Sequence, residues 1–122
     1  MIDLSNNINS QQTIAEPISI KGIGLHSGLD VSMKLYPAKV DYGIKFIRKD
    51  LTNNNIIEAL WSNVSSTKLS TTISNQNGIS VSTIEHLMSA LSGLHIDNIK
   101  IEIDGPEVPI MDGSSIKFVE LI

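Results

Sequence analysis

The residues with the clearest potential for chemistry are Glu85 and His86, a carboxylate and an imidazole that are adjacent in the chain. An imidazole can bind zinc, and a carboxylate beside it can accept a proton from the water that the metal activates. A structural role competes, because Ser82 and Glu85 have the spacing of a capping box, in which the glutamate bonds the serine amide. If Thr83 or a later residue is the N-cap, Glu85 is released from that role. Spacing alone leaves both roles open and favours capping.

A complete metal site is not indicated by the spacing of the other histidines. A catalytic zinc ion takes three protein ligands and a water molecule, whereas the chain has no His-x-His or His-x-x-x-His pair. His26 lies in the glycine-rich segment KGIGLHSG, where a ligand can approach the backbone, although a surface loop explains the same composition. We expect His95, close to Asp97, to be a solvated residue after a helix.

Two further motifs favour structural roles. The glycines of segment 21–28 do not form the dinucleotide-binding pattern G-x-G-x-x-G, because Ser27 stands where the third glycine is needed. Asp112 and Ser114, in the segment MDGSS, are typical of a turn followed by a helix cap.

One helix must position the Glu-His pair. Residues 82–94 carry Ile84, Leu87, Met88 and Leu91 at the spacing of one helical face, and a glycine at position 93 can end the helix. At 100° per residue, positions 85 and 86 point away from that apolar stripe. His86 is therefore not expected to be a core residue of this helix.

Strands are expected over most of the remaining chain, because isoleucine is abundant and β-branched side chains suit sheets. The best strand pattern is the alternation over residues 99–104, and the tetrapeptide NQNG at 75–78 predicts a hairpin. A second, short helix is expected to begin at Ile116. The expected strands cover residues 13–20, 31–36, 43–48, 56–61, 71–74, 79–81 and 99–104.

Composition and charge exclude several classes of protein. The chain has 122 residues, no cysteine and a net charge of −4. Disulfide scaffolds and thiol catalysis are therefore excluded, and nucleic acid is not an expected partner because no basic excess is present. The sequence shows no transmembrane segment and no signal peptide, since residues 1–11 are polar and carry an acidic residue. We expect a disordered segment over residues 1–11 and a soluble, cytoplasmic protein.

Four segments together resemble a known family. They are IKGIGLHSG, TKLSTT, STIEHLMSALSGLHIDN and EVPIMDGSS, at residues 20–28, 67–72, 82–98 and 107–115. In this order they resemble the first domain of the UDP-3-O-acyl-N-acetylglucosamine deacetylases, zinc amidohydrolases of lipid A and lipopolysaccharide biosynthesis in Gram-negative bacteria. The resemblance runs over residues 12–122. It implies an α+β fold, a two-layer sandwich of a mixed β-sheet with two helices on one face, as the first of two similar domains.

The resemblance also implies roles for individual residues. Glu85 would be the general base that activates water for hydrolysis of the N-acetyl amide, and His86 would be a ligand of Zn²⁺. His26 would lie near the sugar–nucleotide part of the substrate. The loop residues that would position the scissile amide beside the metal are Leu69, Ser70 and Thr71.

The chain departs from the family pattern in two respects. The family's other zinc ligands lie in a second domain, and residues 12–122 end before it, so we expect weak zinc binding and no catalysis from this part alone. His95 replaces a residue that is usually glycine, which places the left-handed turn there in doubt. An alternative interpretation is a catalytically silent interaction module that binds a partner chain through the apolar helix face and residues 118–122.

Overall fold

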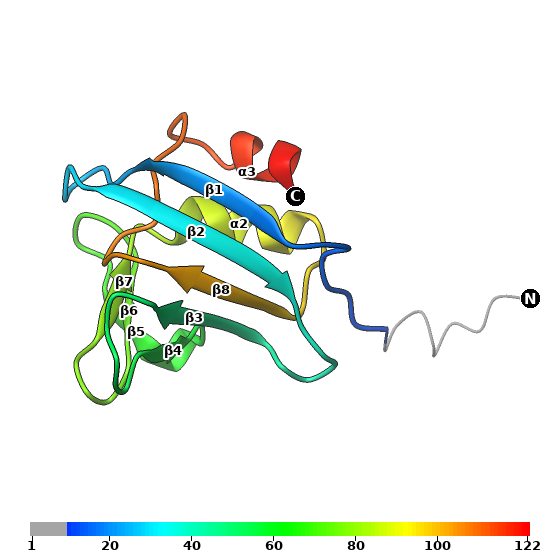
Figure 1. The fold of residues 1–122 in the computed structure, drawn as a ribbon, viewed down its shortest axis with the longest axis horizontal. Coiled ribbons are helices and arrows are strands. Elements are labelled where there is room, and N and C mark those ends of the chain that lie inside the picture. The colour runs from blue at the N-terminus through cyan, green and yellow to red at the C-terminus, as the bar shows by residue number, and fades with distance from the viewer. Residues whose placement is uncertain (1–9) are drawn as a thin grey trace, which may run out of the picture.

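A five-stranded mixed sheet forms one layer of the computed structural model, which describes residues 10–122 (Figure 1). The strand order is β1-β2-β8-β3-β4; neighbours pair antiparallel except β8 and β3, which are parallel. The strands are β1 (Ile18–Ile23), β2 (Asp30–Pro37), β3 (Ile44–Arg48), β4 (Ile56–Glu58) and β8 (Ile99–Ile103). The mixed sheet implied by the family resemblance is therefore confirmed.

Alternation of apolar and polar residues explains the two faces of this sheet. In β8, which lies at its centre, Ile99, Ile101 and Ile103 are fully buried. In β2, alternate side chains such as Met33 and Leu35 point to the same core. Because side chains alternate across a strand, the intervening lysines, tyrosine and glutamate lie on the opposite face of the sheet.

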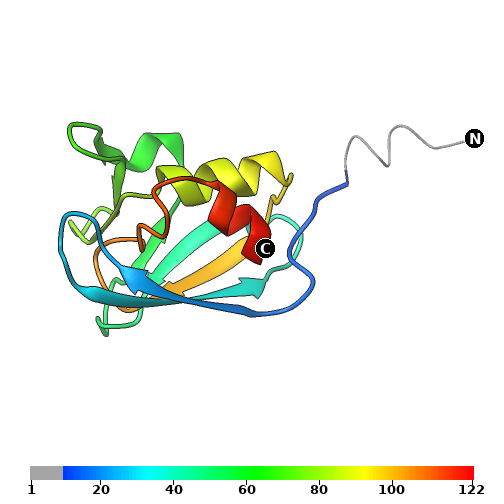
Figure 2. The same ribbon diagram turned by 90° about the horizontal axis from the view of Figure 1, so that it is seen from above.

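Two helices cover one face of the sheet, as expected (Figure 2). They are α2 (Glu85–Gly93) and α3 (Ile116–Leu121). The apolar face of α2 packs into the core through Leu87 and Leu91, and Phe118 of α3 is fully buried. Most of the apolar helix face that the alternative interpretation assigned to a partner is therefore covered by the chain itself. The exposed apolar side chains of α3 are Ile116, Val119 and Leu121.

A second, three-stranded antiparallel sheet was not expected. Its strands are β5 (Val64–Ser66), β6 (Thr72–Ser74) and β7 (Ser80–Ser82). The predicted hairpin is confirmed as the β6–β7 connection, where Gly78 has a φ of 78°. β5 has no apolar alternation to reveal it, since two of its three residues are serine.

Two predicted strands are shorter than their patterns indicated. β1 starts at Ile18 instead of residue 13, immediately after Pro17, whose nitrogen cannot donate to a sheet. β4 ends at Glu58, and Trp61 lies in the 3₁₀ turn η1 (Trp61–Asn63). The expected N-terminal segment, 1–11, lies outside the described residues except for its last two.

The turn after α2 is formed in spite of the missing glycine. His95 has a φ of 58°, in the left-handed region, and the Ile96 N–H donates to the Leu91 carbonyl at 2.9 Å. This bond is typical of a Schellman helix end. The doubt about this turn is therefore removed, and the His95 side chain is exposed, as expected. None of the helices in the described part of the chain has the length and apolar character needed to cross a membrane.

Candidate functional site

The start of α2 leaves Glu85 free of the predicted capping box. Ser82 belongs to β7, and the N-cap residue is Ile84, which makes no side-chain capping bond. The chain enters the helix through Thr83, which has a left-handed φ of 60°. The capping-box interpretation of Ser82 and Glu85 is therefore wrong, because the helix begins after the position that this motif requires.

The Glu85 carboxylate bonds Thr71 instead. The Thr71 N–H donates to Glu85 Oε2 at 2.6 Å, and the Thr71 carbonyl accepts from the Ile84 N–H at 3.3 Å. Both backbone polar groups of Thr71 are thus held at the start of α2, by the N-cap residue Ile84 and by Glu85. The structure brings Thr71 and Glu85 together, although they are 14 positions apart in the chain.

His86 follows in the first turn of α2 and is half-buried. Within residues 10–122 its ring has no hydrogen-bond partner, so both nitrogens are available to an external group. In the same range, no three His, Asp or Glu side chains come close enough together to hold a metal ion. The described residues fit a metal only in part, since the start of α2 carries one imidazole, whereas a catalytic zinc takes three protein ligands.

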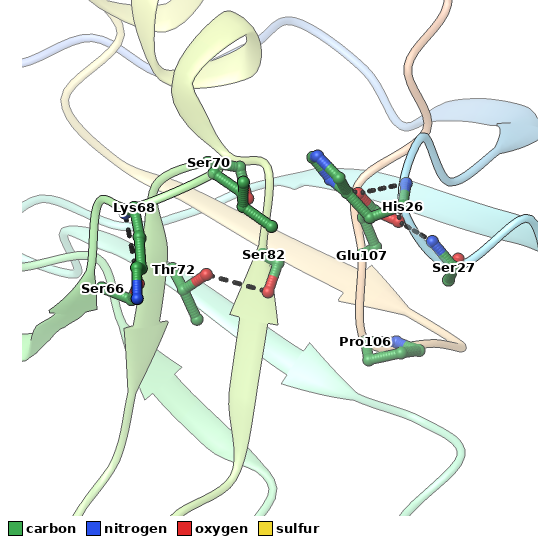
Figure 3. A pocket seen from close by; sticks show the side chains of 10 residues that line it. His26, Ser27, Ser66, Lys68, Ser70, Thr72, Ser82, Pro106 and Glu107 are labelled. Atoms are coloured by element: carbon green, nitrogen blue, oxygen red, sulfur yellow. Dashed lines mark hydrogen bonds and ion pairs between the residues drawn. The ribbon is translucent and has the colours of Figure 1, made fainter.

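A pocket of about 460 Å³ lies beside this helix start (Figure 3). One wall carries His26, Ser27, Pro106 and Glu107, and the opposite wall carries Ser66, Lys68 and Ser70. Leu69 also lines the pocket. Thr72 and Ser82 of the small sheet lie between the walls, joined by a hydrogen bond of 2.9 Å between their hydroxyl groups. The structure thus brings His26, Leu69 and Ser70 to one pocket.

The Glu-His pair does not line this pocket. The pocket is nevertheless connected to the pair by Thr71. This residue lies in the chain between the lining residues Ser70 and Thr72, and its N–H donates to Glu85. Leu69 is 82% exposed, so its apolar side chain lies at the open edge of the pocket.

Sequence reasoning missed Glu107, the buried residue on which the His26 loop is built. Its carboxylate accepts backbone N–H bonds from His26, at 3.0 and 3.1 Å, and from Ser27, at 2.8 Å. Side-chain bonds add the Thr83 hydroxyl and His26 Nδ1, the latter 2.9 Å from Glu107 Oε2. A glutamate flanked by prolines at 106 and 109 was the available signal, but nothing in its spacing showed that it bonds a segment 80 positions earlier.

These bonds keep the buried Glu107 carboxylate ionised. Burial by itself would raise its pKa, but the hydrogen bonds from Thr83, Ser27 and His26 prevail and lower the pKa to about 2. The loop can wrap the carboxylate because residue 24 is glycine. A Cβ on Gly24 would lie 2.5 Å from Glu107 Oε1 and would also clash with Ser27 Oγ.

The MDGSS segment is a turn, as predicted. Asp112 Oδ1 accepts from the Ser114 backbone N–H at 3.0 Å and from its hydroxyl at 2.9 Å. Ser114 Oγ in turn accepts from the Ile116 N–H at the start of α3, at 3.3 Å. The bonds from Ser114 lower the pKa of Asp112, an exposed residue. These hydrogen bonds fix the backbone turn that leads into α3.

Comparison with known proteins relates almost the whole chain to the family that its four sequence segments resemble. Residues 11–122 match the family described as UDP-3-O-acyl N-acetylglycosamine deacetylase. A protein of Geotalea uraniireducens named UDP-3-O-acyl-N-acetylglucosamine deacetylase is 54% identical over 90% of this chain and 36% of its own length. Proteins of the same name from Syntrophotalea carbinolica and Myxococcus xanthus are 52% and 49% identical, over 92% and 93% of this chain. The chain spans about 36% of the length of these curated relatives.

Proposed function

Because the chain belongs to the UDP-3-O-acyl N-acetylglycosamine deacetylase family, we propose that it forms part of the active site of such an enzyme. The reaction is hydrolysis of the N-acetyl amide of UDP-3-O-acyl-N-acetylglucosamine, which yields acetate and the free amine. The reaction belongs to lipid A biosynthesis in the cytoplasm of Gram-negative bacteria. The observation that carries the proposal is the position of Glu85 and His86 at an uncapped helix start beside a pocket.

Glu85 acts as the general base in this proposal. One carboxylate oxygen is fixed by the Thr71 N–H, and no other described residue hydrogen-bonds the group. The bond orients the carboxylate while leaving Oε1 able to accept a proton from an attacking water. An amide is a poor electrophile, so a positioned base that removes this proton is worth about 10²–10⁴ in rate.

His86 binds zinc in this proposal. A half-buried imidazole without a partner in the described part of the chain is suited to ligation. When bound, zinc acts as a Lewis acid that polarises the amide carbonyl and makes water more acidic. The remaining ligands come from outside residues 10–122, because these residues hold no cluster of three ligands.

The pocket holds the substrate in this proposal. His26 contacts the sugar–nucleotide part, and the loop of Leu69, Ser70 and Thr71 positions the scissile amide. The bond between the Thr71 N–H and Glu85 supports this arrangement, because it fixes the end of that loop against the base. The position of the loop and the orientation of the base are thus coupled.

A second function for the same chain is favoured by the exposed apolar side chains of α3. Ile116, Val119 and Leu121 are 62%, 40% and 41% exposed. Side chains of this kind gathered on one helix are typical of a contact with further polypeptide. In the interaction-module interpretation, the surface that binds a partner is therefore limited to α3. Such a surface is also compatible with an enzyme in which this domain contacts a second domain.

Acetate release and zinc retention test the proposal on the complete polypeptide that contains this chain. We expect release of acetate from UDP-3-O-acyl-N-acetylglucosamine, and loss of this activity on treatment with a zinc chelator. Equilibrium dialysis of His86→Ala should show zinc affinity at least about 10-fold below that of the unaltered protein. The control is His95→Ala, an exposed histidine at the other end of α2. Equal zinc retention by both variants would contradict the ligand assignment.

A further inference from the structure

Glu107 connects the two parts of the site that the proposed function uses. Its carboxylate bonds the His26 loop through backbone and side-chain donors, and it bonds the Thr83 hydroxyl just before α2. The neighbouring backbone strengthens the connection, since the Ser82 N–H donates to the Pro106 carbonyl at 2.8 Å. A single buried group thus joins the pocket wall to the start of the helix that carries the Glu-His pair.

We propose that Glu107 is a positioning residue that fixes His26 as the Nδ1-protonated tautomer, so that Nε2 accepts a hydrogen bond from a sugar hydroxyl of the ligand. The proposal rests on the proposed function only for the kind of ligand. The tautomer itself follows from the contacts of Glu107.

The tautomer follows from what the carboxylate can do. Glu107 is ionised near neutral pH, and an ionised carboxylate has only acceptor sites. The atom 2.9 Å from its Oε2 is His26 Nδ1, which must therefore carry the hydrogen. A neutral imidazole has one protonated nitrogen, so Nε2 is left with a lone pair.

The open edge of the ring is the one that bears Nε2. The His26 side chain is 40% exposed, whereas that of Glu107 is 4% exposed. Figure 3 shows the His26 ring against Glu107, reaching into the space opposite Ser70. No described residue bonds Nε2, so this nitrogen is available to a group in the pocket.

The chemistry of Nε2 decides which part of a sugar nucleotide it recognises. A lone pair accepts from a hydroxyl or an N–H and repels a phosphate oxygen, which is itself an acceptor. A sugar hydroxyl supplies the donor. Without Glu107 the ring is free to adopt the other tautomer, which donates at Nε2 and favours phosphate over hydroxyl.

Nitrogen NMR on the complete polypeptide, labelled with ¹⁵N-histidine, tests the tautomer directly. At pH 8.5 an ordinary histidine is neutral, and protonated and unprotonated ring nitrogens give well-separated signals. The His26 signals are assigned by their loss in His26→Asn. We expect hydrogen on Nδ1 alone; hydrogen on Nε2 alone, or on both nitrogens, would overturn the proposal without any variant of Glu107.

The variant Glu107→Gln then tests whether the Glu107 carboxylate sets the tautomer of His26. A glutamine has one acceptor oxygen and an NH₂ group that donates, so His26 Nδ1 becomes an acceptor and hydrogen moves to Nε2. The matched control is Asp104→Asn. This residue is an exposed carboxylate in the same connection that accepts one backbone N–H from Ser32 at 2.8 Å, a bond that the asparagine oxygen retains. An unchanged tautomer in folded Glu107→Gln would show that the carboxylate does not set it.

Binding of UDP-N-acetylglucosamine and of uridine diphosphate identifies the contact. Loss of one hydrogen bond should weaken binding of the sugar nucleotide about 10-fold in Glu107→Gln, while uridine diphosphate, which lacks the sugar, binds no more weakly than before. Equal weakening of both ligands, or of neither, would overturn the assignment to a sugar hydroxyl. None of these measurements needs deacetylation, so they decide the role of Glu107 even in a protein that fails the acetate-release assay.

Discussion

The low pKa of Glu107 predicts a specific dependence of stability on pH. The carboxyl has a pKa of about 2 in the folded protein, against an ordinary value of 4.5. A group with a lowered folded-state pKa contributes stability above its unfolded pKa, and this contribution is lost as pH falls through the folded pKa. The window is therefore between about pH 5 and pH 2.

The magnitude follows from the size of the shift. At 1.36 kcal/mol per unit, the difference between 4.5 and 2 corresponds to about 3 kcal/mol in the free energy of unfolding. In Glu107→Gln this titration is absent, whereas Asp50 and Asp112, whose pKa values are also lowered, titrate in both proteins. Their contributions cancel in the difference between variant and unaltered protein.

Urea unfolding at intervals between pH 6 and pH 2 measures this difference. We expect Glu107→Gln to be destabilised most above pH 5, and the difference in unfolding free energy to shrink by about 3 kcal/mol on acidification. The control is Asp104→Asn, which replaces an exposed carboxyl and leaves Glu107 in place, so the decrease of about 3 kcal/mol expected for Glu107→Gln should be absent. A difference for Glu107→Gln that stays constant over the whole range would refute the hydrogen-bonded, ionised carboxylate.

Two substitutions test the packing that holds the site. Gly22→Ala places a Cβ 2.7 Å from Pro109 Cβ, a ring atom that cannot turn aside, so unfolding should become easier by about 1–3 kcal/mol. Gly93→Ala, with no atom within 4 Å, is its control, and a loss of stability as large as that of Gly22→Ala would contradict the clash. Phe118→Ala empties a fully buried site between α3 and the core and should cost about 3–5 kcal/mol in urea unfolding. A cost below 1 kcal/mol would show that α3 does not pack as described.

The sequence predicts those parts of the fold that depend on local periodicity. β8 and the helix at 85–93 follow from alternating and helical spacing, and the β6–β7 hairpin follows from its turn residues. β5 could not be predicted, because two of its three residues are serine and the strand is defined by the pairing of Val64 and Ser66 with β6. His95 shows the reverse case, in which the fold imposes a left-handed φ on a residue with no preference for it.

The candidate site likewise contains residues that the local sequence predicts and residues that it does not. Glu85 and His86 can be recognised as a reactive pair from types and spacing, whereas the choice between capping and catalysis depends on where the helix begins. Thr83 has a positive φ, so the helix begins later than a capping box at Ser82 requires. No local sequence pattern predicts this conformation of Thr83. Glu107 is harder still to predict, because its role lies in contacts with residues 24 to 81 positions away.

Acetate release by Glu85→Gln tests the central claim most directly. The complete polypeptide and the variant are compared with UDP-3-O-acyl-N-acetylglucosamine as substrate, and Glu120→Gln, an exposed carboxylate on α3, is the control. If Glu85 is the general base, kcat falls about 10²-fold or more in Glu85→Gln and stays unchanged in the control. A kcat for Glu85→Gln equal to that of the unaltered protein would contradict the account.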